Sequence, residues 1–269
     1  MAESKAREWP LIVFTVGLQL AAGIQLSTAL ALWLDPGNAT PLTVLAISVF
    51  PISAVAVAIS FFHLGRPLAG WRSFANISQS KLSREIVVCS LFCVGAFAQC
   101  IEYMFPVART PGLTPVTAVV GIAAVVASAR IYALPGQPLW NSGWVTSSFI
   151  GSMLLLGGVV AKIADDSYRP GTAIMIGAVV LLSSSAVMVM HILRISRSRY
   201  APPEAVSVMQ MKHWLSFLGS IAGTVMPILG GMVTDNSGRL SVASVIMAVA
   251  GVVLGRALMY SRGIALSRF

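Results

Sequence analysis

The chain has 269 residues, of which 57% are hydrophobic and only 10% are charged, and its formal net charge is +9. A soluble domain carries about 25% charged residues, so this composition excludes an ordinary soluble protein. The apolar residues are gathered in runs of about 20, the length of helix that crosses the hydrocarbon layer of a membrane. The sequence therefore predicts an integral membrane protein.

Eight apolar runs follow one another along the chain, separated by turns that contain Pro, Gly and polar residues. They predict an all-α integral membrane protein with eight transmembrane helices in a single membrane anchor domain, residues 1–269. The predicted spans are residues 10–34, 41–62, 85–104, 115–132, 144–163, 171–193, 213–233 and 240–260. The fourth and eighth spans both end with an arginine followed by a tyrosine, which leaves open a division into two four-helix bundles.

The distribution of basic residues predicts the orientation in the membrane. An even number of spans places both termini on one side, and that side receives fourteen of the eighteen basic residues. The opposite side receives Arg109, Lys162, Arg169 and Arg239. Cytoplasmic loops are enriched in Lys and Arg. We therefore expect an inner (cytoplasmic) membrane protein whose termini and His63 loop are cytoplasmic, and the net charge does not argue for a nucleic-acid partner.

The segments outside the spans are short. Eight spans of about 20 residues use roughly 160 residues, and the remainder is divided among segments too small to fold as a catalytic domain. Any chemistry on a soluble substrate must therefore take place on another subunit.

The cysteines and histidines offer few metal ligands. Cys89, Cys93 and Cys100 all fall in the third span, and we interpret them as small hydrophobic residues because an iron–sulfur cluster needs four thiolates. A b-type haem needs two facing imidazoles. We expect His191 and His213 to lie at a similar depth, but both are at span ends, where a haem would be exposed. We expect no haem, and a b-type cytochrome remains an alternative class.

The polar stretch from Phe61 to Ile86 is the best candidate for a redox site. Oxidation of a quinol releases two electrons and two protons, and an imidazole accepts protons near neutral pH. A carboxylate at the membrane boundary is costly and is a functional candidate by default. We predict His63 and Glu85 as the catalytic residues, with Arg66 and Arg84 completing the quinone-binding set. The alternative for Glu85 is a first-turn position that favours negative charge, paired with Arg66 or Arg84.

Two other groups of residues have simpler interpretations. Arg130 and Arg256 lie near span ends, so we expect their side chains to extend to lipid phosphates. Gly157 and Gly158 are expected to allow close helix packing.

Several segments, in this order, resemble one known family: EWPLIVFTVGLQ, HLGRPLAGWRSFANI, LSREI, RIYALPGQPLW and LGRALMYSRGIAL. They resemble the membrane anchor subunits of dimethyl sulfoxide reductase and its relatives, the DmsC family. The resemblance covers essentially the whole chain. It implies an eight-helix subunit without haem that exchanges electrons with menaquinone or ubiquinone. The family's quinol-site histidine falls on His63, and its essential carboxylate falls on Glu85.

The same resemblance implies two partners, a four-cluster iron–sulfur subunit and a molybdopterin catalytic subunit. The chain departs from the family pattern in having no glutamate before the Gly-Arg pair of its last span. Its basic residues also favour the side of the His63 loop, which would place the catalytic subunits in the cytoplasm. That arrangement suits the anchor of a quinone-reducing sulfite dehydrogenase as well as that of a reductase. A small secondary transporter is a further alternative, although no ionisable residue is expected near the bilayer midplane.

Overall fold

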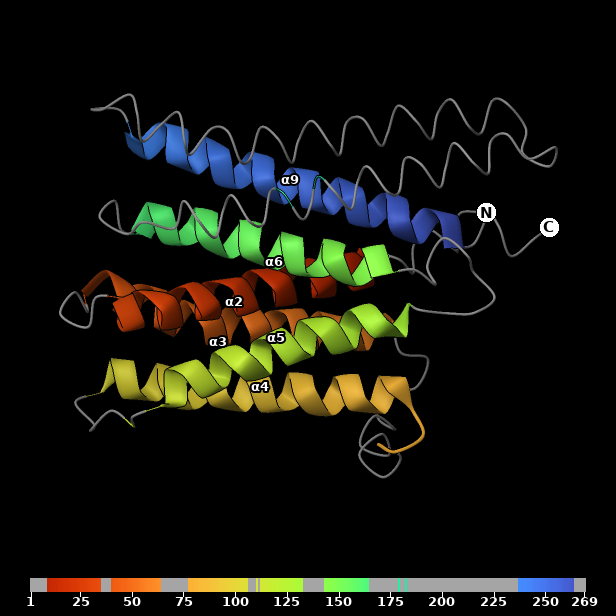
Figure 1. Cartoon of the computed structure of the whole chain (residues 1–269), viewed down its shortest axis with the longest axis horizontal. Coiled ribbons are helices and arrows are strands. Elements are labelled where there is room, and N and C mark those ends of the chain that lie inside the picture. The colour runs from red at the N-terminus through yellow and green to blue at the C-terminus, as the bar shows by residue number, and fades with distance from the viewer. Residues whose placement is uncertain are drawn as a thin grey trace.

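The computed structural model describes residues 9–34, 40–63, 77–105, 110, 112–132, 143–164, 179, 182 and 237–263. In this part of the chain the secondary structure is helical. The elements are α2 (Trp9–Leu34), α3 (Thr40–Ser60), the 3-10 turn η1 (Phe61–His63), α4 (Lys81–Met104), α5 (Leu113–Ile131), α6 (Gly143–Ala164) and α9 (Ser237–Gly263). They run side by side along the longest axis of the molecule (Figure 1). The predicted all-α class is confirmed for these residues.

Several of these helices are suited to a membrane. By length and composition, α2, α3, α4 and α5 could each cross the hydrocarbon layer, and α6 and α9 contain shorter apolar segments, Val145–Ala161 and Val245–Ala257. The protein is therefore a membrane protein with several apolar helices. The predicted spans at 171–193 and 213–233 lie almost wholly outside the described residues, so the count of eight stays a prediction.

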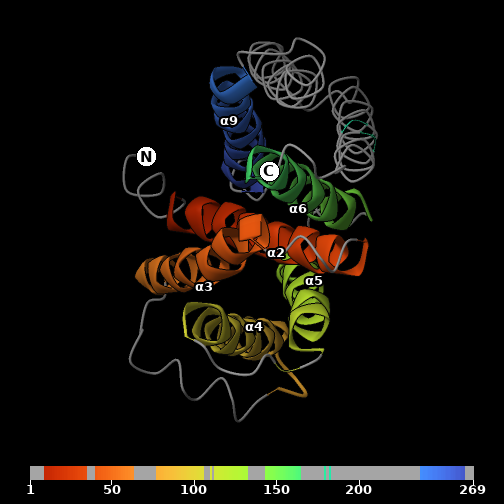
Figure 2. The ribbon, with the colours of Figure 1, turned by 90° about the vertical axis from the view of Figure 1, so that its left-hand side faces the viewer.

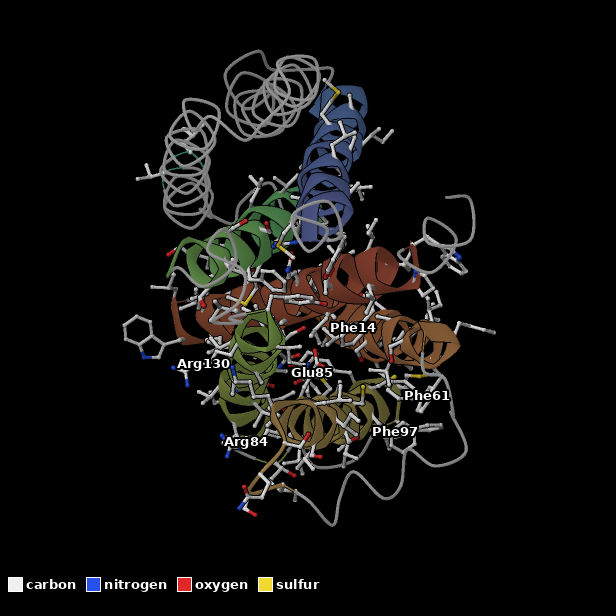
Figure 3. All side chains as sticks on the ribbon, turned by 90° about the vertical axis from the view of Figure 1, so that its right-hand side faces the viewer. Phe14, Phe61, Arg84, Glu85, Phe97 and Arg130 are labelled. Atoms are coloured by element: carbon white, nitrogen blue, oxygen red, sulfur yellow. The ribbon has the colours of Figure 1, made fainter. Side chains whose placement is uncertain are left out.

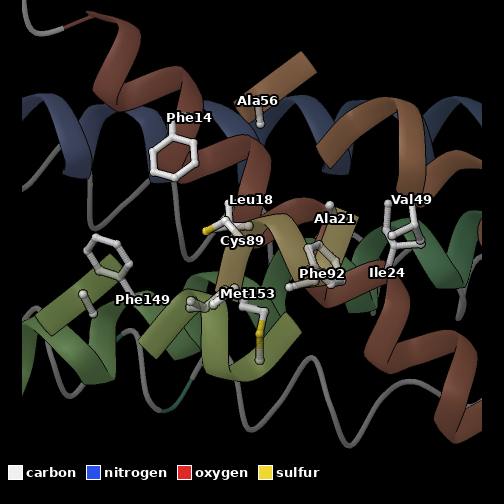
Figure 4. Close-up of a cluster of buried hydrophobic side chains, with 14 of the residues drawn as sticks. Phe14, Leu18, Ala21, Ile24, Val49, Ala56, Cys89, Phe92, Phe149 and Met153 are labelled. Atoms are coloured by element: carbon white, nitrogen blue, oxygen red, sulfur yellow. The ribbon is translucent and has the colours of Figure 1, made fainter. Parts of the chain in front are cut away.

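Helix α2 is the centre of the described bundle. It packs against α3, α5, α6 and α9, while α4 lies across α3 and α5 (Figure 2). Much of α2 is buried, and small residues such as Ala21, Ala22 and Gly23 let neighbouring helices approach it from several sides. Larger side chains fill the remaining space, including Phe92 of α4 and Phe149 and Met153 of α6 (Figure 4). Cys89 joins this hydrophobic core, as its interpretation as a small hydrophobe predicts.

Helices α2 and α6 cross very closely at Gly23 and Gly157. A Cβ atom on Gly23 would meet the Met153 carbonyl oxygen and lie 2.9 Å from Gly157 Cα, and a Cβ on Gly157 would meet the Gly23 backbone. Neither position has space for a side chain. The expectation that Gly157 allows close packing is confirmed, and the structure adds its partner, Gly23, which the sequence pattern did not indicate.

The chain direction defines two ends of the bundle. Helices α2, α4 and α6 begin at the end where α3, α5 and α9 finish, so that Thr15 in the first part of α2 lies near Tyr260 in the last part of α9. We call this the Glu85 end. The other end, where α2 and α4 finish and α5 begins, is the Gln25 end.

Candidate functional site

Glu85 lies inside the bundle near the start of α4. The helix begins at Lys81 because Ser80 is its N-cap, with the Ser80 side chain accepting a hydrogen bond from the Ser83 N–H at 3.3 Å. This start, four residues before the predicted span, puts Glu85 in the second turn and leaves no acid in the first turn. The alternative of a first-turn carboxylate is therefore wrong. The side chain is only 7% exposed, and it lies between the helices in Figure 3.

Arg84 points away from Glu85. Its side chain is exposed, with Nε donating to the Ile77 carbonyl at 2.9 Å and Nη2 donating to the Ser78 carbonyl at 2.5 Å. Figure 3 shows it on the outside of α4. The structure thus separates these two predicted site residues, although they are neighbours in sequence.

The other two predicted site residues belong to the segment between α3 and α4. His63 ends η1, so its backbone lies at the Glu85 end of the bundle. The two residues before it, Phe61 and Phe62, are exposed. Arg66 lies outside the described residues.

A pair of buried tyrosines lies near Glu85. Tyr132 is the C-cap of α5, and Tyr260 is in the last turn of α9. Their hydroxyl oxygens are 2.8 Å apart, a hydrogen-bond distance, and their rings meet edge to face with centroids 5.2 Å apart. The Tyr260 hydroxyl is also 3.5 Å from Thr15 Oγ1, which itself donates to the Leu11 carbonyl. The pair joins α5 and α9 to the central helix.

Arg256 lies one turn before Tyr260 and is 3% exposed. Its guanidinium carbon lies 3.6 Å from the centroid of the Phe149 ring, and Nη2 is 3.5 Å from Ser152 Oγ. A desolvated cation over an aromatic face gains about 2 kcal/mol. The Nε atom has no hydrogen-bond partner in the described part of the chain. The expectation that Arg256 extends to lipid phosphates is therefore wrong, whereas Arg130 is exposed.

Glu85, Ser128, Tyr132, Arg256 and Tyr260 form one buried polar group, which we call the Glu85 cluster. The carboxylate lies beside Ser128 and is close enough to both phenols for electrostatic interaction, and Arg256 interacts with the same phenols. The Ser128 hydroxyl has no well-aligned partner among the described residues. An acid, two phenols and a cation at one end of an apolar bundle can hold, accept and donate protons.

One further buried amide lies on the same face of the central helix. Gln19 follows Thr15 by four residues, which is one helical turn. It is fully buried, and neither of its amide atoms has a partner within the described helices. Its amide atoms and Arg256 Nε are buried polar atoms that have no hydrogen-bond partner among the described residues. In the described part of the protein, no three His, Cys, Asp or Glu side chains come together as metal ligands.

Comparison with known proteins identifies the family. Residues 2–262 match the family model described as DMSO reductase anchor subunit (DmsC). The chain belongs to the DmsC family. Over 94% of both sequences, it is 26% identical to the C subunit of the anaerobic dimethyl sulfoxide reductase of Escherichia coli (strain K12). It is 24% identical to YnfH, an anaerobic dimethyl sulfoxide reductase subunit of the same organism, over 68% of both sequences. The family resemblance drawn from the sequence is confirmed.

Membership in the DmsC family gives the protein its general role. It is the membrane anchor of a molybdoenzyme complex, and the family implies catalytic and iron–sulfur partner subunits. The apolar helices of the structure agree with that role.

Tyr132, Tyr260 and Arg256 of this DmsC-type anchor were not predicted as site residues. The spacing of these residues along their helices could nevertheless have indicated which of them face the interior. Residues four apart share a helix face, so a buried Tyr260 brings Arg256 inside with it. Residues two apart lie about 200° around the helix from one another. Tyr132 therefore faces the interior while Arg130 faces outward. The two Arg-then-Tyr endings look alike in sequence, but their different spacing gives their arginines opposite environments.

Proposed function

We propose that this anchor subunit binds a quinone headgroup at the Glu85 cluster and passes electrons between the membrane quinone pool and the iron–sulfur subunit. One observation carries the proposal. A carboxylate is buried at one end of an apolar bundle beside Ser128 Oγ, a hydroxyl that has no well-aligned partner within the described helices. A buried acid among apolar helices is costly and is retained where it has a function. Interior polar atoms that lack a partner among the described residues, such as those of Gln19 and Arg256 Nε, suit a headgroup that has two carbonyl or hydroxyl oxygens.

Each residue of the proposed site has a role in quinol oxidation that follows from the chemistry of its side chain. When bound, menaquinol or ubiquinol supplies two electrons and two protons. Glu85 and His63 are the proposed proton acceptors, because a carboxylate and an imidazole can both act as general bases. Ser128 offers a hydroxyl donor beside the carboxylate. Arg256 supplies a buried positive charge that interacts with the same two phenols as the Glu85 carboxylate.

The two arginines predicted from the sequence take more distant roles. Arg84 is fixed at the outer edge of α4 by backbone carbonyls, so it contributes positive charge at the boundary and does not touch the Glu85 carboxylate. Arg66, which follows His63 in the loop before α4, is proposed to approach the headgroup from that loop.

The electrons would leave the membrane at the Glu85 end. We propose that the four-cluster iron–sulfur subunit docks there, connected in turn to the molybdopterin catalytic subunit. The positive charge of the loops supports a cytoplasmic position for this end at the inner membrane. Release of protons on the same side as the substrate chemistry would make the reaction electroneutral.

The proposal is tested by paired substitutions in the assembled complex. Glu85→Gln keeps the size of the side chain but removes its ability to take up a proton. Loss of a general base lowers a rate by about 10²–10⁴-fold, so we expect that loss in quinol-coupled turnover. Turnover with a soluble dye as electron donor should not change, because the dye bypasses the membrane site.

Glu102→Gln is the matched control. It makes the same change at the other end of α4, where Glu102 accepts a hydrogen bond from the Thr110 N–H at 3.1 Å. A glutamine can keep that bond, so quinol turnover should stay within about twofold of the wild-type rate, a change worth less than 1 kcal/mol. A Glu85→Gln complex with the wild-type quinol rate would show that the headgroup is bound elsewhere.

A further inference from the structure

A groove runs along the outside of α4 and α5 at the Glu85 end, with a volume of about 530 Å³. Its walls are apolar side chains from both helices, among them Val87, Val88 and Val126. Its polar lining consists of three basic residues, Lys81, Arg84 and Arg130. The groove therefore combines a cationic end with apolar walls long enough to hold part of a hydrocarbon chain.

The helix geometry explains why the three cations meet. Lys81 and Arg84 are three residues apart and so share one face at the start of α4. Arg130 lies in the last turn of α5, which finishes at the end where α4 begins. All three side chains are exposed, and Figure 3 shows Arg84 and Arg130 on the same outer side. The carbonyls of Ile77 and Ser78 hold the Arg84 guanidinium at this position.

The lining of the groove carries positive charge alone. The described residues that form it include no acid. Glu85, the acid nearest in sequence, is 7% exposed and lies in the interior behind α4. The cations therefore favour an anionic ligand, and the apolar walls below them favour one with an acyl chain.

We propose that this groove binds an anionic phospholipid, with its phosphate among Lys81, Arg84 and Arg130 and an acyl chain along the apolar wall. Basic pockets between transmembrane helices on the cytoplasmic side are suited to such headgroups. A zwitterionic lipid or a neutral quinone gains much less from three cations, because neither carries a net negative charge. The inference does not depend on the proposed quinone site.

A bound lipid would connect the two helices that line the groove. The inner faces of α4 and α5 carry Glu85 and Ser128, while their outer faces carry the cations. A lipid that binds both outer faces would therefore also fix the distance between Glu85 and Ser128 on the inner faces. That is a positioning effect, since the lipid touches neither of them.

Native mass spectrometry of the purified full-length complex tests the proposal. The complex is titrated in detergent with dioleoyl phosphatidylglycerol and, separately, with dioleoyl phosphatidylethanolamine. We expect a preference of about tenfold or more for phosphatidylglycerol. Each cation near a lipid phosphate contributes about fivefold in affinity, so the double variant Lys81→Gln/Arg130→Gln should bind phosphatidylglycerol about 25-fold more weakly. Arg130→Lys keeps the positive charge, so its affinity for phosphatidylglycerol should fall only slightly.

Arg239→Gln is the control for loss of a cation away from the groove. It removes one cation, where the double variant removes two, and it lies at the start of α9, at the opposite end of the bundle. It should bind phosphatidylglycerol as the wild type does. Equal binding of the two lipids by the wild type would overturn the proposal. So would a loss in Arg239→Gln as large as that in the double variant. If the double variant instead releases the iron–sulfur subunit while keeping its lipid, the groove is a protein contact and the proposal is wrong.

Discussion

The two ends of the bundle contain buried polar groups of different kinds. At the Gln25 end, Gln25 Nε2 donates to Gln99 Oε1 at 2.7 Å and to the Thr114 carbonyl at 2.9 Å, and Gln99 Nε2 donates back to Gln25 Oε1 at 3.2 Å. This network is neutral, and its groups satisfy one another. At the Glu85 end, the cluster contains an acid and a cation. Among the described residues, Ser128 Oγ has no well-aligned partner and Arg256 Nε has none.

The contrast separates the polar groups that hold helices together from those available to a ligand. A paired amide network in a membrane fixes the register of α2, α4 and α5, and its groups bond to protein atoms of these three helices. A charged cluster with unused polar atoms is expensive to keep in an apolar bundle, and a bound headgroup would satisfy it. Substitutions at the Glu85 end should therefore change turnover, and those at the Gln25 end should change stability.

A loss of turnover comparable to that of Glu85→Gln is expected from His63→Ala. If His63 accepts a proton from the quinol, its removal should lower quinol-coupled turnover by about 10²-fold or more. Assembly and dye-driven turnover should remain normal. The measurement is a pair of rates, one with quinol and one with dye, on the same membrane preparation. Equal loss of both rates would indicate a structural role for His63 and weaken the contrast between the two ends.

The largest effect on stability is expected from Gly23→Ala, between the two ends. The new Cβ would meet the Met153 carbonyl and the Gly157 backbone, and overpacking of this kind costs about 1–3 kcal/mol. Thermal unfolding in detergent should show a lowered midpoint. Gly143→Ala is the control, because a Cβ there would have no described atom within 4 Å. Equal midpoints for the two variants would mean that α2 and α6 do not cross so closely.

A smaller loss of stability is expected from Gln25→Leu, which leaves the Gln99 amide without its partner. Interhelical hydrogen bonds in membranes contribute about 0.6–1.7 kcal/mol, so the unfolding free energy should fall by about that amount. The double variant Gln25→Leu/Gln99→Leu should recover much of the loss, because both partners are then apolar. Quinol turnover of either folded variant should be unchanged. A loss of turnover with normal stability would assign function to the Gln25 end as well.

The smallest effect is expected from Tyr260→Phe, which removes one hydroxyl and keeps the ring. It breaks the 2.8 Å contact with Tyr132 and should lower the unfolding free energy by about 1 kcal/mol or less. Its effect on quinol turnover should be clear but weaker than that of Glu85→Gln, because the phenol acts through its neighbours. Unchanged quinol turnover would remove the tyrosine pair from the functional group.

The sequence was sufficient for the fold class, the apolar helices and the family. Those properties depend on run length, composition and short motifs such as HLGRP and LSREI, all of which are local. The choice of Glu85 as a candidate also followed from its position, because an acid at the boundary of an apolar run is conspicuous. The cap at Ser80 could have been predicted because serine is a preferred N-cap residue, and it shifts Glu85 out of the first turn.

The inward faces of the helices could not be predicted in the same way. In a membrane the lipid-facing and core-facing sides are both apolar, so hydrophobic periodicity does not distinguish them. The burial of Arg256 over Phe149 and the pairing of Tyr132 with Tyr260 depend on contacts between residues more than 100 positions apart. Likewise, which of Arg84 and Glu85 faces the interior depends on how α4 is rotated about its own axis relative to the bundle, and the sequence does not show this.

The central claim is that a quinone headgroup binds at the Glu85 end, and direct binding tests it most simply. A fluorescent quinol analogue is titrated into the purified complex, and quenching of its fluorescence reports binding. The account predicts saturable binding by the wild type and by Glu102→Gln. It predicts binding about tenfold weaker or more by Glu85→Gln, a loss of about 1.4 kcal/mol. Equal affinity of Glu85→Gln and the wild type for the analogue would contradict the account.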